Sequence, residues 1–175
     1  SLGQLLRTGV DNWHLTVIGD GPARSDVEAE FDAQMLTTSH VSFSGQCVPE
    51  QTREILGNSD LFVGPAVNEA FGMALLEAQA AGLPVLAGGV GGVSGIVSEG
   101  VAGWLVPVVD DAAFSDRLAS CLTCDVTALR QMGAAGASKA MQHHTVAAAA
   151  NTLGATLRTL ASEHGMGSSV GQGEA

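Results

Sequence analysis

Five short runs of apolar residues, separated by segments of helical character, constrain the fold of this chain more than any other feature. The runs lie at residues 15–19, 41–44, 61–64, 84–87 and 104–107. Each is four or five residues long and is closed by Gly, Pro or Ser, which is typical of a β-strand. Because the apolarity is continuous rather than alternating, we expect strands buried on both faces, as in a parallel sheet.

The segments between these runs have the pattern of helices. We expect helices at about residues 24–39, 50–58, 70–81 and 93–98. The alternation of strand and helix predicts an α/β fold with a doubly wound parallel sheet.

After Pro107 the strands stop and only helices are expected. The candidate caps are Asp110 or Asp111, then Asp125 or Thr127, then Thr145, for helices ending near Leu122, Gln142 and His164. We therefore predict one domain over residues 1–163. The segment 164–175 is rich in Gly and Ser, and we expect a disordered tail there.

The composition excludes several classes of function. The chain has 175 residues, a formal net charge of −11 and only seven Lys and Arg residues, which argues against a nucleic-acid surface or a polybasic membrane patch. No apolar run is long enough to span a bilayer, and we see no signal peptide. We expect a cytoplasmic protein. The first residue is serine rather than methionine, so a processed chain or a fragment is expected.

The three cysteines do not predict a metal site. Cys121 and Cys124 form a Cys-x-x-Cys pair, but a zinc site needs two further ligands, and the nearby candidates are only His143 and His144. A lone pair of this kind is a weak signal. We expect two small residues on a helix, no bound metal and a reducing environment.

Two glutamates eight positions apart are the strongest candidates for chemistry. Glu69 stands at the mouth of the helix expected over 70–81, and Glu77 lies inside it among alanines and leucines. A carboxylate on such an apolar helix face is costly to bury unless hydrogen bonds are donated to it. A sugar diol can donate two, one to each carboxylate oxygen.

Several short motifs, in order, resemble one enzyme family. They are LTVIGDGP (15–22), VSFSG (41–45), LFVGP (61–65), EAFG (69–72), GLPV (82–85), GG (91–92) and GWLV (103–106). From Trp13 to about Leu160 the chain resembles the C-terminal, donor-binding domain of glycosyltransferase family 4, a retaining family of GT-B architecture. Glu69 and Glu77 match the Glu-x7-Glu signature of that family. The ordered series is far more specific than any one motif.

The resemblance implies a nucleotide-diphosphate sugar as substrate, transfer of its sugar to an acceptor hydroxyl, and no cofactor or metal. Glu69 would hold hydroxyls of the transferred sugar as the catalytic residue, and Glu77 would hold the ribose. The remaining donor-binding positions implied are Ala70, Phe71, Gly72 and Met73 at the helix start, Gly19 and Gly21 near the nucleotide, and Ser44, Gly45 and Gln46 against the base. Backbone N–H groups at a helix start can face a diphosphate.

Other interpretations of the same residues stay open. Glu77 could face water or meet an arginine, Glu69 could be a first-turn helix charge, and Gly72 could be a packing glycine. Gly88-Gly89 and Gly91-Gly92 could be plain turns. Gly19-Asp-Gly21 lacks the third glycine of a dinucleotide fingerprint, so a nicotinamide site is not predicted.

The chain departs from the family pattern at its beginning. The Gly-Arg turn and lysine that neutralise the diphosphate are missing, as are the first strand and the N-terminal acceptor-binding domain with its histidine. In a sheet of order 3-2-1-4-5-6 the first strand is central, so its loss leaves two unpaired edges. We expect the strands at 15–19 and 61–64 to close this gap by pairing directly.

Two functions are consistent with this pattern. The first is the donor-binding half of an enzyme that needs its missing half, which could also bring it to a membrane surface. The second is a truncated or non-catalytic module that binds a nucleotide sugar or serves as a partner subunit.

Overall fold

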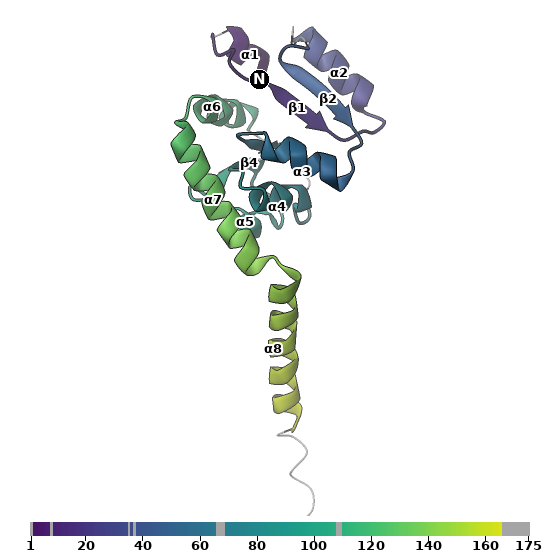
Figure 1. Ribbon diagram of the computed structural model, residues 1–175, viewed down its shortest axis with the longest axis vertical. Coiled ribbons are helices and arrows are strands. Elements are labelled where there is room, and N and C mark those ends of the chain that lie inside the picture. Colours follow the sequence, from purple (N-terminus) through teal and green to yellow (C-terminus); the bar gives the residue numbers. More distant parts are fainter. Residues whose placement is uncertain are drawn as a thin grey trace, which may run out of the picture.

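The computed structural model describes residues 2–7, 9–34, 36, 38–65, 69–107 and 110–165 (Figure 1). The elements in chain order are α1 (Leu2–Arg7), β1 (Leu15–Ile18), α2 (Arg24–Ala33), β2 (Val41–Gly45), α3 (Pro49–Gly57), β3 (Phe62–Gly64), α4 (Met73–Ala80), β4 (Val85–Gly88), α5 (Val93–Ile96), β5 (Gly103–Val106), α6 (Asp111–Leu122), α7 (Val126–His143) and α8 (Val146–Gly165). All five predicted strands are present within one residue of their expected ends. The α/β prediction is confirmed.

Every strand pair is parallel. One sheet has the order β1-β2 and the other the order β3-β4-β5. The central strand β4 is buried along its whole length, as the continuous apolar run predicted.

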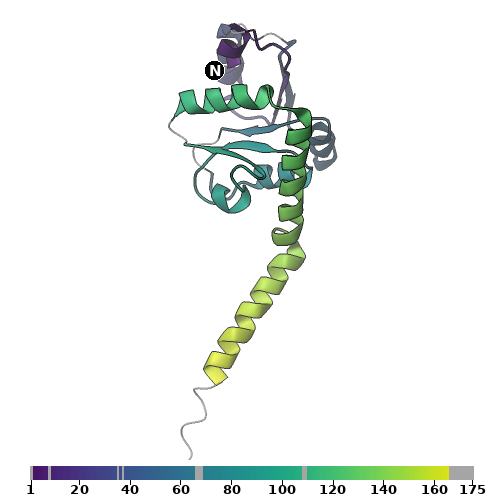
Figure 2. The same cartoon turned by 90° about the vertical axis from the view of Figure 1, so that its left-hand side faces the viewer.

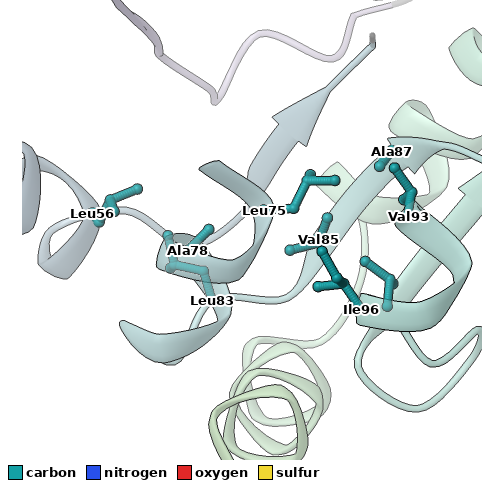
Figure 3. Close-up of a cluster of buried hydrophobic side chains, with 9 residues drawn as sticks. Leu56, Leu75, Ala78, Leu83, Val85, Ala87, Val93 and Ile96 are labelled. Carbon is teal, nitrogen blue, oxygen red and sulfur yellow. The ribbon is translucent and has the colours of Figure 1, made fainter. Parts of the chain in front are cut away.

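Helices cover both faces of the three-stranded sheet, because successive side chains of β4 point to opposite faces. Val85 and Ala87 belong to a first buried cluster, shown in Figure 3. Its other members come from α3, α4, α5 and the adjoining loops: Leu56, Leu75, Ala78, Leu83, Val93, Ile96 and Val97. Leu86 belongs to a second cluster, with Leu5 of α1 and Leu118 of α6. This two-sided cover is the doubly wound arrangement predicted above.

The predicted pairing of residues 15–19 with 61–64 is wrong. Over the described ranges, β1 pairs only with β2 and β3 only with β4, and no strand of this chain lies between β1 and β3. Figure 1 shows β1, β2 and α2 as a unit beside the rest of the fold. The helices at the two ends of this unit are anchored on the larger sheet, α1 through Leu5 in the second cluster and α3 through Leu56 in the first. Closing the gap would pull both helices out of place.

The C-terminal helices occupy their predicted positions. Asp110 and Asp125 cap α6 and α7, and Thr145 Oγ1 accepts a hydrogen bond from Ala148 N at 3.1 Å at the start of α8. Helix α8 extends away from the other elements (Figure 2). Among the described residues, no helix is long and apolar enough to cross a membrane. Most of the predicted tail, residues 166–175, lies outside the described residues.

Candidate functional site

The loop between β3 and α4 is organised by Glu69. The N–H groups of Phe71 and Gly72 donate to Glu69 Oε1, at 3.3 and 2.8 Å. Two of the three N–H groups predicted to face a diphosphate are therefore held by the half-buried carboxylate of the same loop. A donor that uses these N–H groups has to exchange places with Glu69.

Helix α4 begins at Met73, later than the predicted residue 70, because Gly72 precedes it in the left-handed conformation with φ of +88°. A Cβ on Gly72 would lie 2.9 Å from Leu75 Cδ1 and 3.5 Å from Ile96 Cδ1. Glycine is therefore required here by the backbone conformation and by the packing of the core. This supports the alternative, given from the sequence, that Gly72 is a packing glycine. Phe71 and Met73, on either side, are exposed.

The loop after β4, which contains Gly91 and Gly92, packs against the Glu69 loop. Gly92 N donates to Ala70 O at 3.2 Å, and a Cβ on Gly91 would lie 2.2 Å from Glu69 O. The backbones after β3 and β4 therefore touch at the carboxyl ends of these two strands. Gly91-Gly92 is not a plain turn, since it permits this close approach.

Glu77 is not buried, contrary to the premise drawn from its apolar neighbours. The buried side chains of α4 are Leu75, Ala78 and Gln79, and Glu77 is on the exposed side. It lines a cavity of about 510 Å³ between α3, α4 and Cys47. We call this cavity the α3–α4 groove; its lining residues are Cys47, Pro49, Thr52, Arg53, Leu56, Glu77, Ala80 and Ala81.

The predicted base loop leads directly into this groove. Ser44, Gly45 and Gln46 close β2, and the next residue, Cys47, is part of the groove wall. The structure therefore brings Glu77 into one groove with Cys47, the residue that follows the base loop, although the two are 30 positions apart in sequence.

The ends of β1 and β2 are joined at Gly19 and Gly45. Gly19 N donates to Gly45 O at 2.8 Å, and both residues have positive φ, at +122° and +66°. Gly21 follows on the exposed surface, where its N–H donates to Asp20 Oδ1 at 2.8 Å. Gly19 and Gly21 thus lie at the carboxyl end of the smaller sheet, in a different sheet from the strand that leads to Glu69.

Two arginines at these loops were not singled out from the sequence. Arg24 stacks over the Phe43 ring at 5.5 Å and donates to Glu28 Oε1 at 2.7 Å, and this hydrogen bond raises the pKa of its guanidinium. Arg53 lines the α3–α4 groove with Glu77. The sequence feature that could have indicated Arg53 is the helical spacing of Pro49, Thr52, Arg53 and Leu56, which lie on the one face of α3 that lines the groove.

The described residues contain no group of three or more His, Cys, Asp or Glu side chains placed to hold a metal ion. Burial raises the pKa of the Cys121 thiol to about 11, so it is protonated at neutral pH. A protonated thiol is a poor metal ligand.

A second cavity, of about 230 Å³, lies at the amino ends of β3 and β4. Asp60 and Arg130 are among its lining residues. It is therefore at the edge of the sheet opposite the Glu69 loop and contains none of the predicted site residues.

Known proteins resemble this chain in sequence. The sequence profile of the family "Glycosyl transferases group 1" matches residues 1–139. The chain is 34% identical over 155 residues to a D-inositol 3-phosphate glycosyltransferase of Nocardia farcinica, covering 89% of this chain and 34% of that protein. It is 29% identical over 152 residues to a phosphatidyl-myo-inositol mannosyltransferase of Mycobacterium leprae, covering 86% of this chain and 39% of that protein. The chain thus spans little more than a third of these curated relatives.

Solved structures resemble the fold as well. The sucrose-phosphate synthase of Thermosynechococcus elongatus superimposes with a TM-score of 0.76 at 27% identity, over 93% of this chain and 42% of that one. Anabaena Alr3699/HepE, solved in complex with UDP, superimposes with a TM-score of 0.76 at 21% identity, over 90% of this chain and 44% of that one. At that identity the second similarity concerns the fold alone.

Proposed function

The chain belongs to the family of group 1 glycosyl transferases, and on this premise we propose that it is the donor-binding half of a retaining glycosyltransferase. The substrate is a nucleotide-diphosphate sugar, whose sugar passes to an acceptor hydroxyl with release of the nucleoside diphosphate and a proton. The acceptor-binding half would be a separate domain.

The observation that carries the proposal is the position of Glu77 in the α3–α4 groove beside the end of the base loop. An exposed carboxylate without an ion pair among the described residues is free to accept two ribose hydroxyls. Ser44, Gly45 and Gln46 directly precede Cys47 of the groove wall, and we expect the base to bind there, with Gly19 and Gly21 on the neighbouring strand end.

At the sugar end, Glu69 is the proposed catalytic residue. Its carboxylate has more acceptor capacity than the two N–H groups of Phe71 and Gly72 fill. We expect Glu69 to release these two N–H groups when the donor binds, so that its carboxylate accepts sugar hydroxyls. The N–H groups of Phe71, Gly72 and Met73 and the start of α4 then face the diphosphate. Ala70 is held by Gly92 and keeps this loop against the sheet.

The isolated chain is expected to bind its donor weakly and to turn it over poorly. The Gly-Arg turn and the lysine that would neutralise the diphosphate are missing, and the net charge of −11 repels an anionic ligand.

A second candidate function is a non-catalytic nucleotide-sugar-binding module or partner subunit. The edges of β1 and β3 that have no partner strand among the described residues favour it. An upstream reading frame encoding a second Rossmann-like half and a Gly-Arg turn favours the enzyme, whereas a stop codon there favours the module.

The proposal is tested by the Glu77→Gln variant. Since hydrogen bonds to a charged group stabilise a complex by about 1.5–3 kcal/mol, we expect roughly 10- to 100-fold weaker binding of UDP or GDP. Isothermal titration calorimetry measures it. Glu54→Gln, on α3 outside the groove, is the matched control and should bind as the wild type does. Unchanged affinity of Glu77→Gln would remove the ribose role of this residue.

A further inference from the structure

Arg53 and Glu77 stand on the two walls of the α3–α4 groove. Arg53 is the fifth residue of α3, which begins at Pro49, and Glu77 is the fifth residue of α4, which begins at Met73. Helix α3 follows β2 and α4 follows β3, so each helix begins after the carboxyl end of a strand, although the two strands belong to different sheets. Both side chains line the same cavity, so a ligand held by Glu77 meets the face of α3 that carries Arg53.

Arg53 is available to such a ligand. Its ion pair is with Glu50 on the surface, where Nη2 lies 2.8 Å from Glu50 Oε1 and the two side chains are 69% and 71% exposed. An exposed pair of this kind contributes little and is easily exchanged. Among the described residues, Arg53 and Glu77 form no ion pair within 4.0 Å. The guanidinium therefore has N–H donors beyond the one that bonds Glu50.

The other polar group on this wall is the Thr52 hydroxyl, whereas Leu56, Ala80 and Ala81 make the remaining wall apolar. Such a site accepts a flat apolar ring and presents donors to its edge. Guanine offers the acceptors O6 and N7 to the fork of an arginine, and uracil offers O4. Adenine places an amino donor beside N7, which an arginine fork cannot satisfy.

On the proposed function above, we infer that Arg53 is a specificity-determining residue that reads the base of the donor and favours guanine or uracil over adenine. Position 53 acts through direct hydrogen bonds to carbonyl oxygen of the base. The alternative role, a countercharge for the diphosphate or for Glu77, affects all nucleotides equally because it does not involve the base.

The test is calorimetric titration of the full chain with GDP, UDP and ADP. For the wild type we expect GDP or UDP to bind at least about tenfold more tightly than ADP. In Arg53→Ala the affinity for the preferred nucleotide, GDP or UDP, should fall by about tenfold. The affinity for ADP should change by less than about twofold. Arg53→Lys keeps the charge but loses the fork, so it should not restore the preference. Arg130→Ala, which removes the same charge at the opposite cavity, is the matched control and should change nothing.

Three outcomes overturn the inference. Equal weakening of all three nucleotides in Arg53→Ala, with recovery in Arg53→Lys, identifies a countercharge. Unchanged selectivity in Arg53→Ala, together with lost binding in Glu77→Gln, removes the role of Arg53 and leaves the proposed function standing. Failure of the wild type to bind any of the three nucleotides overturns both.

Discussion

Gly91 has the strongest local influence on the shape of the candidate site. Its backbone is in the left-handed region with φ of +55°, and its Cα faces the Glu69 carbonyl so closely that a Cβ would lie 2.2 Å from that oxygen. Both the conformation and the approach require glycine. The position of Glu69 therefore depends on a residue in a different loop, 22 positions later in the sequence.

Replacing Gly91 with alanine should destabilise the fold and displace the Glu69 loop. We expect a loss of at least about 2 kcal/mol in the free energy of unfolding, since strain and a backbone clash add. Urea denaturation measures it. Gly95→Ala is the control, because Gly95 is exposed in α5 with open space around its Cβ position and should gain up to about 1 kcal/mol. Equal stability of the two variants would contradict the close approach at Gly91.

At the scale of single elements, the start of α7 is set by one side chain. Asp125 Oδ1 accepts hydrogen bonds from Thr127 N at 2.8 Å and Ala128 N at 3.2 Å. The sequence left Asp125 and Thr127 as alternative starts, and the hydrogen bonds identify Asp125. These bonds, led by the one from Ala128, lower the pKa of Asp125 from its usual 3.8.

This cap should give α7 an acid-sensitive contribution to stability. Because the folded pKa is below 3.8, the contribution is complete above that pH and is lost as the pH falls through the folded pKa. Asp125→Ala should lower the Tm at pH 7 by about 2–4 °C. It should also flatten the decline of the Tm as the pH falls below 3.8. Thermal scans at several pH values measure this. Asp125→Asn keeps an acceptor oxygen and should retain part of the Tm without the acid dependence. If both variants lose Tm at acid pH as steeply as the wild type does, the titrating group is a residue other than Asp125.

At the scale of the whole molecule, the strands form two parallel sheets rather than one. Among the described residues, β1 and β3 each have one edge without a partner strand, while β4 has a neighbour on both sides. Free strand edges expose backbone N–H groups to solvent. The gap also separates Gly19 and Gly21 from the Glu69 loop.

The sheet arrangement predicts an uneven pattern of amide hydrogen exchange. Amides of β4 should exchange slowest, whereas the N–H groups of β1 and β3 that point into the gap should exchange faster by roughly two orders of magnitude or more. Residue-resolved exchange measured by NMR tests this. Uniform protection of β1, β3 and β4 would show that another strand occupies the gap.

Much of the fold followed from local patterns along the chain. The five strands were predicted within one residue, and the last three helices were predicted with their caps, because apolar runs and capping side chains act over a few residues. One boundary was wrong where a side chain of the preceding loop holds the backbone. The helix expected from residue 70 begins at Met73, since Glu69 and Gly72 hold the preceding turn open.

The sequence alone therefore determined the helices and strands and indicated both glutamates as candidate site residues. The tertiary structure decided which side chains are buried, which strands pair and where the groove lies. The local pattern of the sequence did not show that Gln79 is fully buried and Glu77 exposed, because that depends on which face of α4 packs against the sheet. Nor did it show that β1 and β3 stay apart, because α1 and α3 are anchored on opposite faces of the larger sheet. The groove that joins Cys47, Arg53 and Glu77 lies between α3 and α4, which meet through Leu56 and Ala78 in the first buried cluster. Local preferences act between neighbours in the chain, and this contact joins residues that only folding brings together.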